Sequence, residues 1–203
     1  MKIGVVILAA GAASRMGKAK MLLPFKEHSI LLHILQEVKA IHPASICLVT
    51  GKYQHEIETA LDKDLVPIVQ NDHWSNGMAG SIKLGLANLL QNQPLLDAVI
   101  LVVSDQPFLD RTVLTNLLDV YKQTGKGMIA ANYEGIHGTP VLFAKQYFNE
   151  LEKLVGDKGA SAILQANLDD LATIEFPLGA LDIDTEEDYQ RLLRLINEAH
   201  VKR

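Results

Sequence analysis

Short apolar runs alternate along this chain with segments whose apolar residues recur every three or four positions. The runs predict buried strands, because each is short and is bounded by polar or turn-forming residues. They span residues 3–9, 45–50, 66–69, 98–103, 128–131, 172–175 and 180–182. The recurring positions, in residues 31–38 and 82–90, are typical of amphipathic helices. Strands that alternate with helices predict βαβ units and a mainly parallel sheet.

Residues 132–140 interrupt this alternation. Their turn-forming residues predict a β excursion beside the main sheet, where a second substrate could be held. Helix starts are also readable from the sequence. Asp110 is placed to cap a helix that starts near Arg111, and Thr185 with Asp188 forms a T-x-x-D box at the start of the last helix.

Composition places the chain among globular proteins. It has 203 residues, of which 48% are hydrophobic and 21% are charged, so one domain over residues 1–203 with a sizeable core is expected. The net charge of −5 argues against a general nucleic-acid binder. No apolar run is long enough to cross a bilayer, and Cys47 is the only cysteine, which excludes an internal disulfide. We expect a cytoplasmic enzyme or binding domain, with no nucleic-acid or membrane partner.

The most informative stretch covers residues 3–24, IGVVILAAGAASRMGKAKMLLP. Its apolar strand ends in small residues, including Ala10 and Gly11, and the cations Arg15 and Lys20 follow. Small residues let backbone N–H groups approach a phosphate chain closely, and the cations neutralise it. The carboxyl end of the first strand is also where open α/β sheets bind ligands. The pattern therefore favours a phosphate-binding turn.

The standard phosphate loops and a signal peptide fit this stretch less well. A Walker loop requires G-x-x-x-x-G-K-[ST], but Gly11 and Gly17 are one residue too far apart for it. The dinucleotide fingerprint G-x-G-x-x-G is not matched either. A secretory signal peptide is disfavoured, because its positive region would be a single lysine. A glycine-rich turn with solvated cations is the structural alternative, and we give it the lower weight.

A carboxylate at the end of a buried strand marks the second informative stretch, VILVVSDQP, at residues 99–107. The apolar run leads through Ser104 to Asp105, which is therefore expected at the ligand-binding edge of the sheet. Mg²⁺ prefers one or two protein carboxylates together with phosphate oxygens, so Asp105 beside a phosphate-binding turn is a candidate ligand. An aspartate that caps a turn is the alternative.

Two further carboxylates occur in LDIDT, at residues 181–185. Asp182 and Asp184 alternate along an extended segment and would therefore point to opposite faces. At most one of them is expected to share a metal with Asp105. The other would be favourable as a negative charge at the start of the last helix. The seven histidines are scattered and lack the spacing of metal ligands.

Three turn-rich stretches are candidates for substrate contact. The first, QNDHWSNGMAGS at residues 70–81, leads into a helix expected to begin near Ser81, and its small and amide residues are suited to reading a base edge. A half-buried Trp74 beside a surface His73 is the commoner situation, so base contact by Trp74 is the less favoured interpretation. The other two are GIHGTP at residues 135–140 and GDKGA at residues 156–160.

Six motifs of this chain resemble those of the MobA-like nucleotidyltransferases and follow one another in the same order. The resemblance is closest to the molybdenum cofactor cytidylyltransferase branch. The motifs are L-A-A-G-x-x-x-R-M-G-x-x-K, N-x-x-W…G-M, SDQP, GTPVLF, GDKGA and LDIDT. The resemblance covers nearly the whole chain. It implies an α/β fold of three αβα layers, with a mainly parallel, Rossmann-like sheet of the nucleotide-diphospho-sugar transferase (GT-A-like) type and a small β excursion. Ser104 departs from the family's usual Gly, and Thr139 from its usual His or Asn.

The resemblance also implies the residues of each site. The nucleotide-binding residues are Leu8, Ala9, Ala10, Gly11, Arg15, Lys20, Thr50, Asn71, Gly77, Ser81 and Asp105. The catalytic residues are Arg15, Lys20 and Asp105. The ligands for Mg²⁺ are Asp105 with Asp182 or Asp184, and Asp182 is favoured because it lies nearer the end of the predicted strand. The acceptor-substrate residues are Gln106, Pro107, Gly138, Thr139, Pro140 and Asp157. Capping of a solvated turn is the alternative for Asp157.

These features predict nucleotidyl transfer, in which an acceptor phosphate attacks the α-phosphorus of a nucleoside triphosphate and pyrophosphate leaves. No strong general base is needed, because a phosphate acceptor is already anionic at neutral pH. The resemblance implies CTP, favoured over GTP by Ala10, and the molybdopterin cofactor as substrates. It also implies an apo-molybdenum hydroxylase, or the maturation chaperone of that hydroxylase, as a candidate partner.

Three alternatives remain open from the sequence. The first is the same chemistry with another triphosphate or another acceptor, such as a sugar or alditol phosphate. The second is redox chemistry on a pigment or flavin-like substrate, which is disfavoured because both candidate metal carboxylates are present. The third is a non-catalytic chaperone that carries the molybdenum cofactor to an apo-hydroxylase.

Overall fold

A seven-stranded sheet forms the centre of the computed structural model, which describes residues 1–11, 16–62, 64–157, 159–181 and 183–201. The strand order is β5-β4-β1-β6-β8-β7-β9. Its strands are β1 (Ile3–Ala9), β4 (Ser45–Thr50), β5 (Ile68–Gln70), β6 (Ala98–Val103), β7 (Met128–Tyr133), β8 (Ile136–Ala144) and β9 (Leu171–Glu175). A separate two-stranded sheet pairs β2 (Pro24–Phe25) with β3 (His28–Ser29).

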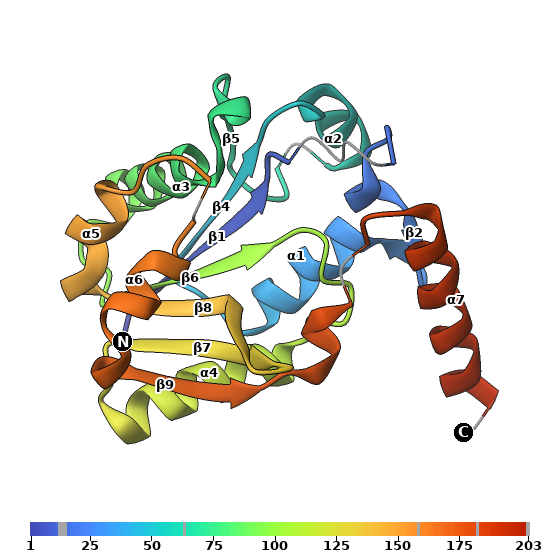
Figure 1. The fold of residues 1–203 in the computed structure, drawn as a ribbon. Helices are drawn as coiled ribbons and strands as arrows, with labels where there is room; N and C mark the ends of the chain where they lie inside the picture. The colour runs from blue at the N-terminus through green and yellow to red at the C-terminus, as the bar shows by residue number, and fades with distance from the viewer. Residues whose placement is uncertain (12–15, 63, 158, 182, 202–203) are drawn as a thin grey trace.

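Helices cover both faces of the sheet, so the architecture is three-layered αβα (Figure 1). The α-helices are α1 (Ile30–Ala40), α2 (Gln54–Ala60), α3 (Met78–Asn92), α4 (Arg111–Thr124), α5 (Phe148–Glu152), α6 (Ser161–Ala166) and α7 (Glu186–Val201). The 3-10 helices are η1 (Lys20–Leu22), η2 (Trp74–Asn76), η3 (Lys145–Tyr147), η4 (Leu168–Asp170) and η5 (Pro177–Ala180). None of the helices in the described part of the chain combines the length and the apolar character needed to cross a membrane.

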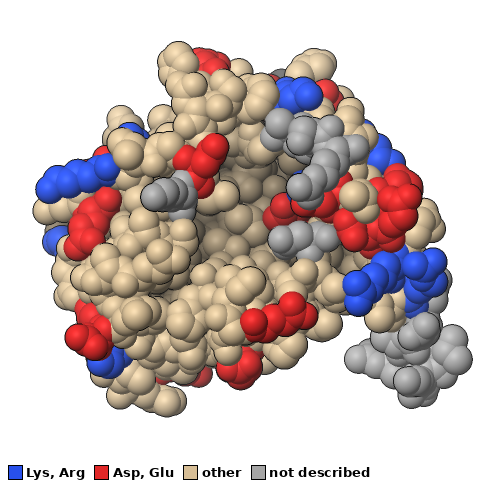
Figure 2. All heavy atoms as spheres, viewed as in Figure 1, with Lys and Arg blue, Asp and Glu red and all other residues tan. Residues whose placement is uncertain are grey.

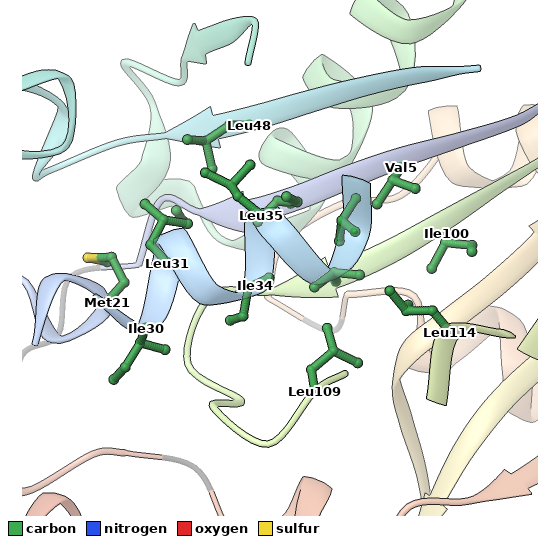
Figure 3. Close-up of a cluster of buried hydrophobic side chains, with 14 of the residues drawn as sticks. Val5, Met21, Ile30, Leu31, Ile34, Leu35, Leu48, Ile100, Leu109 and Leu114 are labelled. Atoms are coloured by element: carbon green, nitrogen blue, oxygen red, sulfur yellow. The ribbon is translucent and has the colours of Figure 1, made fainter. Parts of the chain in front are cut away.

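Two hydrophobic cores, one on each face, hold the layers together. Alternate residues of β1 point to opposite faces, so Val5 and Ile7 join the core with α1, α2, α4 and α7, whereas Val6 and Leu8 join the core with α3, α5 and α6. In the first core, Leu35 of α1 packs beneath β1 and β4 (Figure 3). Cys47 of β4 is fully buried, and burial raises the pKa of its thiol to about 12, which removes it as a nucleophile.

The predicted bounds of the central strands agree closely with those in the structure. β1, β4 and β6 have the bounds expected from their apolar runs, and they pair in parallel as predicted. β5 begins at Ile68, two residues later than expected, because Pro67 has no N–H to donate to a ladder. Asp110 caps α4 by accepting a hydrogen bond from the Val113 N–H at 2.9 Å.

The predicted excursion at residues 132–140 is wrong in its placement, because these residues belong to the main sheet. Glu134 and Gly135 both have positive φ, 55° and 81°, so they form the tight turn of a β-hairpin between β7 and β8. β8 then runs antiparallel between β6 and β7, and its residues Val141 to Phe143 are almost completely buried. A register shift between Ala130 and Ala131 leaves Thr139 and Pro140 without partners in β7.

The predicted strand at residues 180–182 is also wrong, because Ala180 ends the 3-10 helix η5. Pro177 occupies the first position of this helix, where its fixed φ is compatible and its missing N–H has no effect. Gly179 then packs against the ring of Phe176, where a Cβ would approach the ring to 2.5 Å. A turn, and not an extended strand, therefore leads towards α7.

The carboxylate of Asp170 holds together the end of the sheet at which β7 and β9 begin. Asp170 accepts bonds from the Gly127 N–H at 2.9 Å, the Gln146 amide at 2.8 Å and the Tyr147 hydroxyl at 2.7 Å. The Gly127 bond, followed by the Tyr147 bond, outweighs burial and holds the pKa of Asp170 below its ordinary value. Burial and this carboxylate together raise the pKa of Tyr147 to about 12.

We expect Asp170→Asn to destabilise the fold at pH 7 by about 1–3 kcal/mol, because it removes a charged acceptor of three hydrogen bonds. Since the folded-state pKa is lowered, this contribution is present above the ordinary value of 3.8 and is lost as the pH falls below it. Urea unfolding at pH 7 and pH 3 measures the difference. Asp169→Asn, at the exposed neighbour, is the control and should match wild type. An equal loss of unfolding free energy at both pH values would contradict a role for the negative charge of Asp170.

Candidate active site

The carboxyl ends of the central strands border a cavity of about 650 Å³. β1 contributes Leu8 and is followed by Ala10 and Gly11, and β6 leads through Ser104 to Asp105. The two strands pair in parallel, so these segments necessarily emerge at the same edge of the sheet. Figure 2 shows this face with a central hollow that is bordered by acidic side chains.

One ammonium group joins two carboxylates on the wall of this cavity. The Lys20 Nζ lies 2.8 Å from Asp105 Oδ2 and 2.9 Å from Asp184 Oδ1. The three residues come from η1, the end of β6 and the segment before α7, which are far apart in the sequence. The side chains are 12%, 25% and 45% exposed, respectively. The expected meeting of Lys20 with Asp105 is therefore observed, with Asp184 as a third member.

The carboxylates keep Lys20 charged. Burial acts to lower the pKa of the ammonium, but Asp105 and Asp184 outweigh it and raise the pKa above 10.5. Because the folded-state pKa is raised, the stabilisation from these pairs is complete at neutral pH and is lost only as the pH rises through the folded-state value. The site therefore presents a permanent cation beside two carboxylates under physiological conditions.

The backbone next to Lys20 is held by contacts with α1 and α7. Met21 is 2% exposed and lies against the first turn of α1, beside Ile30 and Leu31 (Figure 3). Lys18 pairs with Glu186 of α7 at 2.8 Å, and the Tyr189 hydroxyl donates to the Pro24 carbonyl at 2.8 Å. The Tyr189 bond therefore ties the last helix to the chain just after Lys20, whereas the Lys18–Glu186 pair, whose side chains are 49% and 53% exposed, adds little.

The start of α7 has the expected reciprocal cap. Asp188 Oδ2 accepts from the Thr185 N–H at 2.9 Å, and Thr185 Oγ1 accepts from the Asp188 N–H at 3.2 Å. The same carboxylate oxygen accepts from the Asp184 N–H at 3.2 Å. The cap thereby holds the backbone of Asp184 in place next to Lys20.

A second cavity of about 220 Å³ adjoins the first, and the two share Leu8, Met78, Val103 and Asp157. Three predicted acceptor residues line it: Gly138, Thr139 and Asp157. Its remaining wall combines the apolar Ile82, Leu101, Val141 and Leu164 with the polar Tyr133, His137 and Ser161. The β7–β8 hairpin and the loop before α6 together form this half of the site.

The remaining predicted acceptor residues lie behind this wall. Gln106 is 2% exposed, donates to the Gly179 carbonyl at 2.9 Å and accepts from the Thr139 hydroxyl at 3.3 Å. Pro107 and Pro140 are buried and border neither cavity. Gln106 therefore ties the end of β6 to η5 and to Thr139, as a positioning residue.

The predicted nucleotide-binding residues divide in the same way. Those that line the larger cavity are Leu8, Ala10, Gly11, Lys20, Gly77, Ser81 and Asp105. Ala9 instead points into the core beneath α1, and Thr50 is buried and donates to the Gln54 side chain. Asn71 is buried behind Ser81, to which it donates at 2.9 Å. Asn71 thus orients a cavity residue without bordering the cavity.

A glycine lets the loop before α3 approach the loop before α6 closely. Gly77 has a φ of 104°, and a Cβ here would clash with Asp157 Oδ1 and lie 2.6 Å from the Gly156 backbone. The Gly156 carbonyl accepts from the Ala79 N–H at 3.2 Å. This close approach explains why Asp157 borders both cavities.

Two predicted residues, Arg15 and Asp182, lie outside the described residues. Among the described residues, no three His, Cys, Asp or Glu side chains gather closely enough to hold a metal without help. Of the described carboxylates that line the larger cavity, Asp105 and Asp184 are the pair that contacts Lys20. Two carboxylates, completed by phosphate oxygens, are the ligand set that Mg²⁺ prefers.

Trp74 lies on the wall of the larger cavity, a position that the sequence pattern did not predict. The indole is half-buried, as expected, but it also lines the larger cavity together with Ser75 and Met78. Met78 is the first residue of α3, which begins three residues earlier than predicted. Met78 is 42% exposed, but this exposure is a property of the fold, and no local sequence pattern signals it.

Comparison with known families identifies the class of protein. The model of the MobA-like NTP transferase domain matches residues 5–171, so the chain belongs to this family. The family expected from the motifs is thereby confirmed. The bifunctional protein GlmU of Francisella tularensis subsp. novicida (strain U112) is 29% identical over 168 residues, which cover 80% of this chain and 35% of that protein. The chain thus spans about a third of the length of the curated relatives it matches.

Solved structures show the same fold. Rv0371c from Mycobacterium tuberculosis H37Rv is similar with a TM-score of 0.82 and 27% identity, covering 95% of this chain and 97% of that chain. The complex of Rv0371c with manganese gives a TM-score of 0.78 at 26% identity, covering 96% and 99% of the two chains. The expected αβα fold of the nucleotide-diphospho-sugar transferase type is confirmed.

Because Trp74 is the only tryptophan in the chain and borders the larger cavity, we expect its fluorescence to report nucleotide entry. Titration with each of the four nucleoside triphosphates should give a saturable change in emission with at least one of them. If a base stacks on the indole, Trp74→Ala should weaken binding by about 1–3 kcal/mol, measured by calorimetry. Tyr121→Ala, on α4, is an aromatic control. If calorimetry shows the protein saturated with nucleotide while the emission spectrum is unchanged, nucleotide does not bind beside Trp74.

Proposed function

We propose that this protein transfers a nucleoside monophosphate from a nucleoside triphosphate to a phosphate-bearing acceptor, and that CTP and the molybdopterin cofactor are the substrates. The observation that carries the proposal is the convergence of Lys20, Asp105 and Asp184 on one wall of the 650 Å³ cavity. A cation beside two carboxylates at strand ends suits the handling of a metal-bound triphosphate.

Phosphate binding is assigned to the turn after β1. Ala10 and Gly11 border the cavity, and a Cβ on Gly11 would meet no atom of the described residues within 4 Å, so the backbone there is open to a ligand. Lys20 would neutralise the triphosphate and the leaving pyrophosphate, and Arg15 is proposed for the same role from its place in the motif. The small side chain of Ala10 is the basis for preferring CTP.

Asp105 and Asp184 are proposed as ligands of a divalent ion. The fit is supported by their chemistry, because both already hold one cation, the Lys20 ammonium. The manganese complex of the similar Rv0371c supports divalent-metal use within this group of proteins. Mg²⁺ bound here would supply charge neutralisation of the triphosphate. Asp182 remains a candidate from its motif alone.

The smaller cavity is proposed to hold the acceptor. Leu101, Val141 and Leu164 give it an apolar surface suited to a flat ring, and Thr139 and Asp157 offer hydrogen-bond acceptors at its border. A pterin presents both a flat face and N–H donors. A sugar phosphate would match the polar side chains of this cavity but would leave its apolar part without complementary surface, so the pterin-bearing cofactor is the better match.

In the proposed reaction, an oxygen of the acceptor phosphate forms a bond to the α-phosphorus of the triphosphate. The bond from the α-phosphorus to the bridging β-oxygen breaks, and pyrophosphate leaves with that electron pair. The protein's contribution is to align the two anions across the adjoining cavities and to stabilise the developing charge with Lys20. Thr139 and Asp157 would orient the acceptor.

The deciding experiment incubates the protein with Mg²⁺, each of the four nucleoside triphosphates in turn, and the molybdopterin cofactor. We expect the cytosine dinucleotide cofactor and pyrophosphate, identified by mass. Parallel reactions replace the cofactor with a sugar phosphate or an alditol phosphate. Transfer to those acceptors alone would overturn the choice of acceptor, and tight cofactor binding without turnover would indicate a chaperone that carries the cofactor to an apo-molybdenum hydroxylase.

Lys20→Ala and Asp105→Asn are each expected to slow transfer by about 10²–10³-fold or more, because each removes a charge that the reaction needs at the phosphates. Circular dichroism should show that both variants remain folded. Lys122→Ala, which removes an exposed lysine of α4 paired with its helix neighbour Asp119, is the control. Turnover like that of wild type in either site variant would refute the mechanism.

A further inference from the structure

Lys20 occupies the position between the two carboxylates that the proposed function gives to a divalent ion. The nearest oxygens of Asp105 and Asp184 are 2.8 and 2.9 Å from the ammonium. These are direct contacts, and the lysine side chain is only 12% exposed. Without nucleotide, the charge of these carboxylates is therefore already partly balanced.

An ammonium and a divalent cation compete for these carboxylates. Both would lie within a few ångströms of each other in a partly buried site, where like charges repel strongly. Mg²⁺ also gives up its water ligands reluctantly, so it gains little by competing for a carboxylate that already has a hydrogen-bonded partner. The free protein should thus bind a divalent ion weakly.

A triphosphate changes this balance. Its oxygens offer the Lys20 ammonium new partners, and they supply the additional ligands that a divalent ion needs. The lysine side chain is flexible and carries three rotatable donors, so it can turn from carboxylate to phosphate. Met21, buried against α1, keeps the neighbouring backbone in place, so the change is confined to the side chain.

We propose that Lys20 acts as an exchangeable counter-ion: it holds the Asp105 and Asp184 carboxylates until nucleotide arrives, and then passes to the phosphates as the divalent ion takes its place. The proposal rests on the proposed function, because it takes the cavity to be the site of a metal-bound triphosphate. It explains why one residue is paired with both carboxylates. Divalent ion and nucleotide then bind cooperatively.

The test is metal binding in the absence of turnover. Mn²⁺ is titrated into wild type, Lys20→Met and Lys18→Met, with and without CTP and with no acceptor, and free Mn²⁺ is measured by electron paramagnetic resonance. Without CTP, we expect Lys20→Met to bind Mn²⁺ about tenfold more tightly than wild type, because the competing cation is gone. The gain in Mn²⁺ affinity on adding CTP should shrink by a similar factor.

Lys18→Met is a matched control, since it removes an equal charge nearby from a lysine paired with Glu186. It should change Mn²⁺ affinity by no more than about twofold, which measures the general effect of net charge. Adding Asp105→Asn to Lys20→Met should abolish the tighter Mn²⁺ binding of Lys20→Met. This result would place the ion at Asp105. Lys20→Gln and Lys20→Arg serve if Lys20→Met does not fold, with tighter Mn²⁺ binding expected only in the glutamine variant.

Mn²⁺ binding by Lys20→Met that equals or falls below that of wild type would overturn the proposal. This outcome is separate from failure of the proposed function. A protein that transfers no nucleotide can still show the Mn²⁺ gain. Conversely, a working transferase whose Mn²⁺ affinity is unaffected by Lys20 has the function without the exchange.

Discussion

The arrangement of the molecule depends on the contact of one ammonium with two carboxylates. Lys20 belongs to the turn after the first strand, Asp105 to the end of the middle strand and Asp184 to the approach to the last helix. Each segment reaches this point through the parallel packing of the sheet or the cap of α7. The contact therefore joins the beginning, the middle and the end of the chain at one place.

Strands buried on both faces were the most predictable part of the fold. The runs of β1, β4 and β6 are apolar throughout most of their length, and polar or small residues end them, so their bounds follow from composition. The position of Asp105 beside Lys20 followed from the same rule, because parallel strands bring their carboxyl ends to one edge. The cap that Asp110 provides for α4 depends only on neighbouring residues, so it too could be predicted from the sequence.

The errors have physical causes that lie outside the segments concerned. β8 escapes prediction because an antiparallel strand enters a parallel sheet only through a tight reversal, and the turn at Glu134 and Gly135 does not reveal which strands its arms will join. η5 escapes it because contacts with Phe176 and Tyr133 favour a turn where local pattern favours a strand. The place of Trp74 on the cavity depends on how η2 meets the sheet, which no local pattern encodes.

The antiparallel insertion of β8 has an evolutionary consequence. The surface proposed for the second substrate comes mainly from one later part of the chain, the β7–β8 hairpin and the loop before α6, whereas the triphosphate surface comes mainly from segments before and at the end of β6. Substitutions in the later part can alter which molecule receives the nucleotide while the earlier part stays unchanged. A scaffold divided in this way can come to accept different acceptor molecules while the residues that act on the triphosphate stay the same.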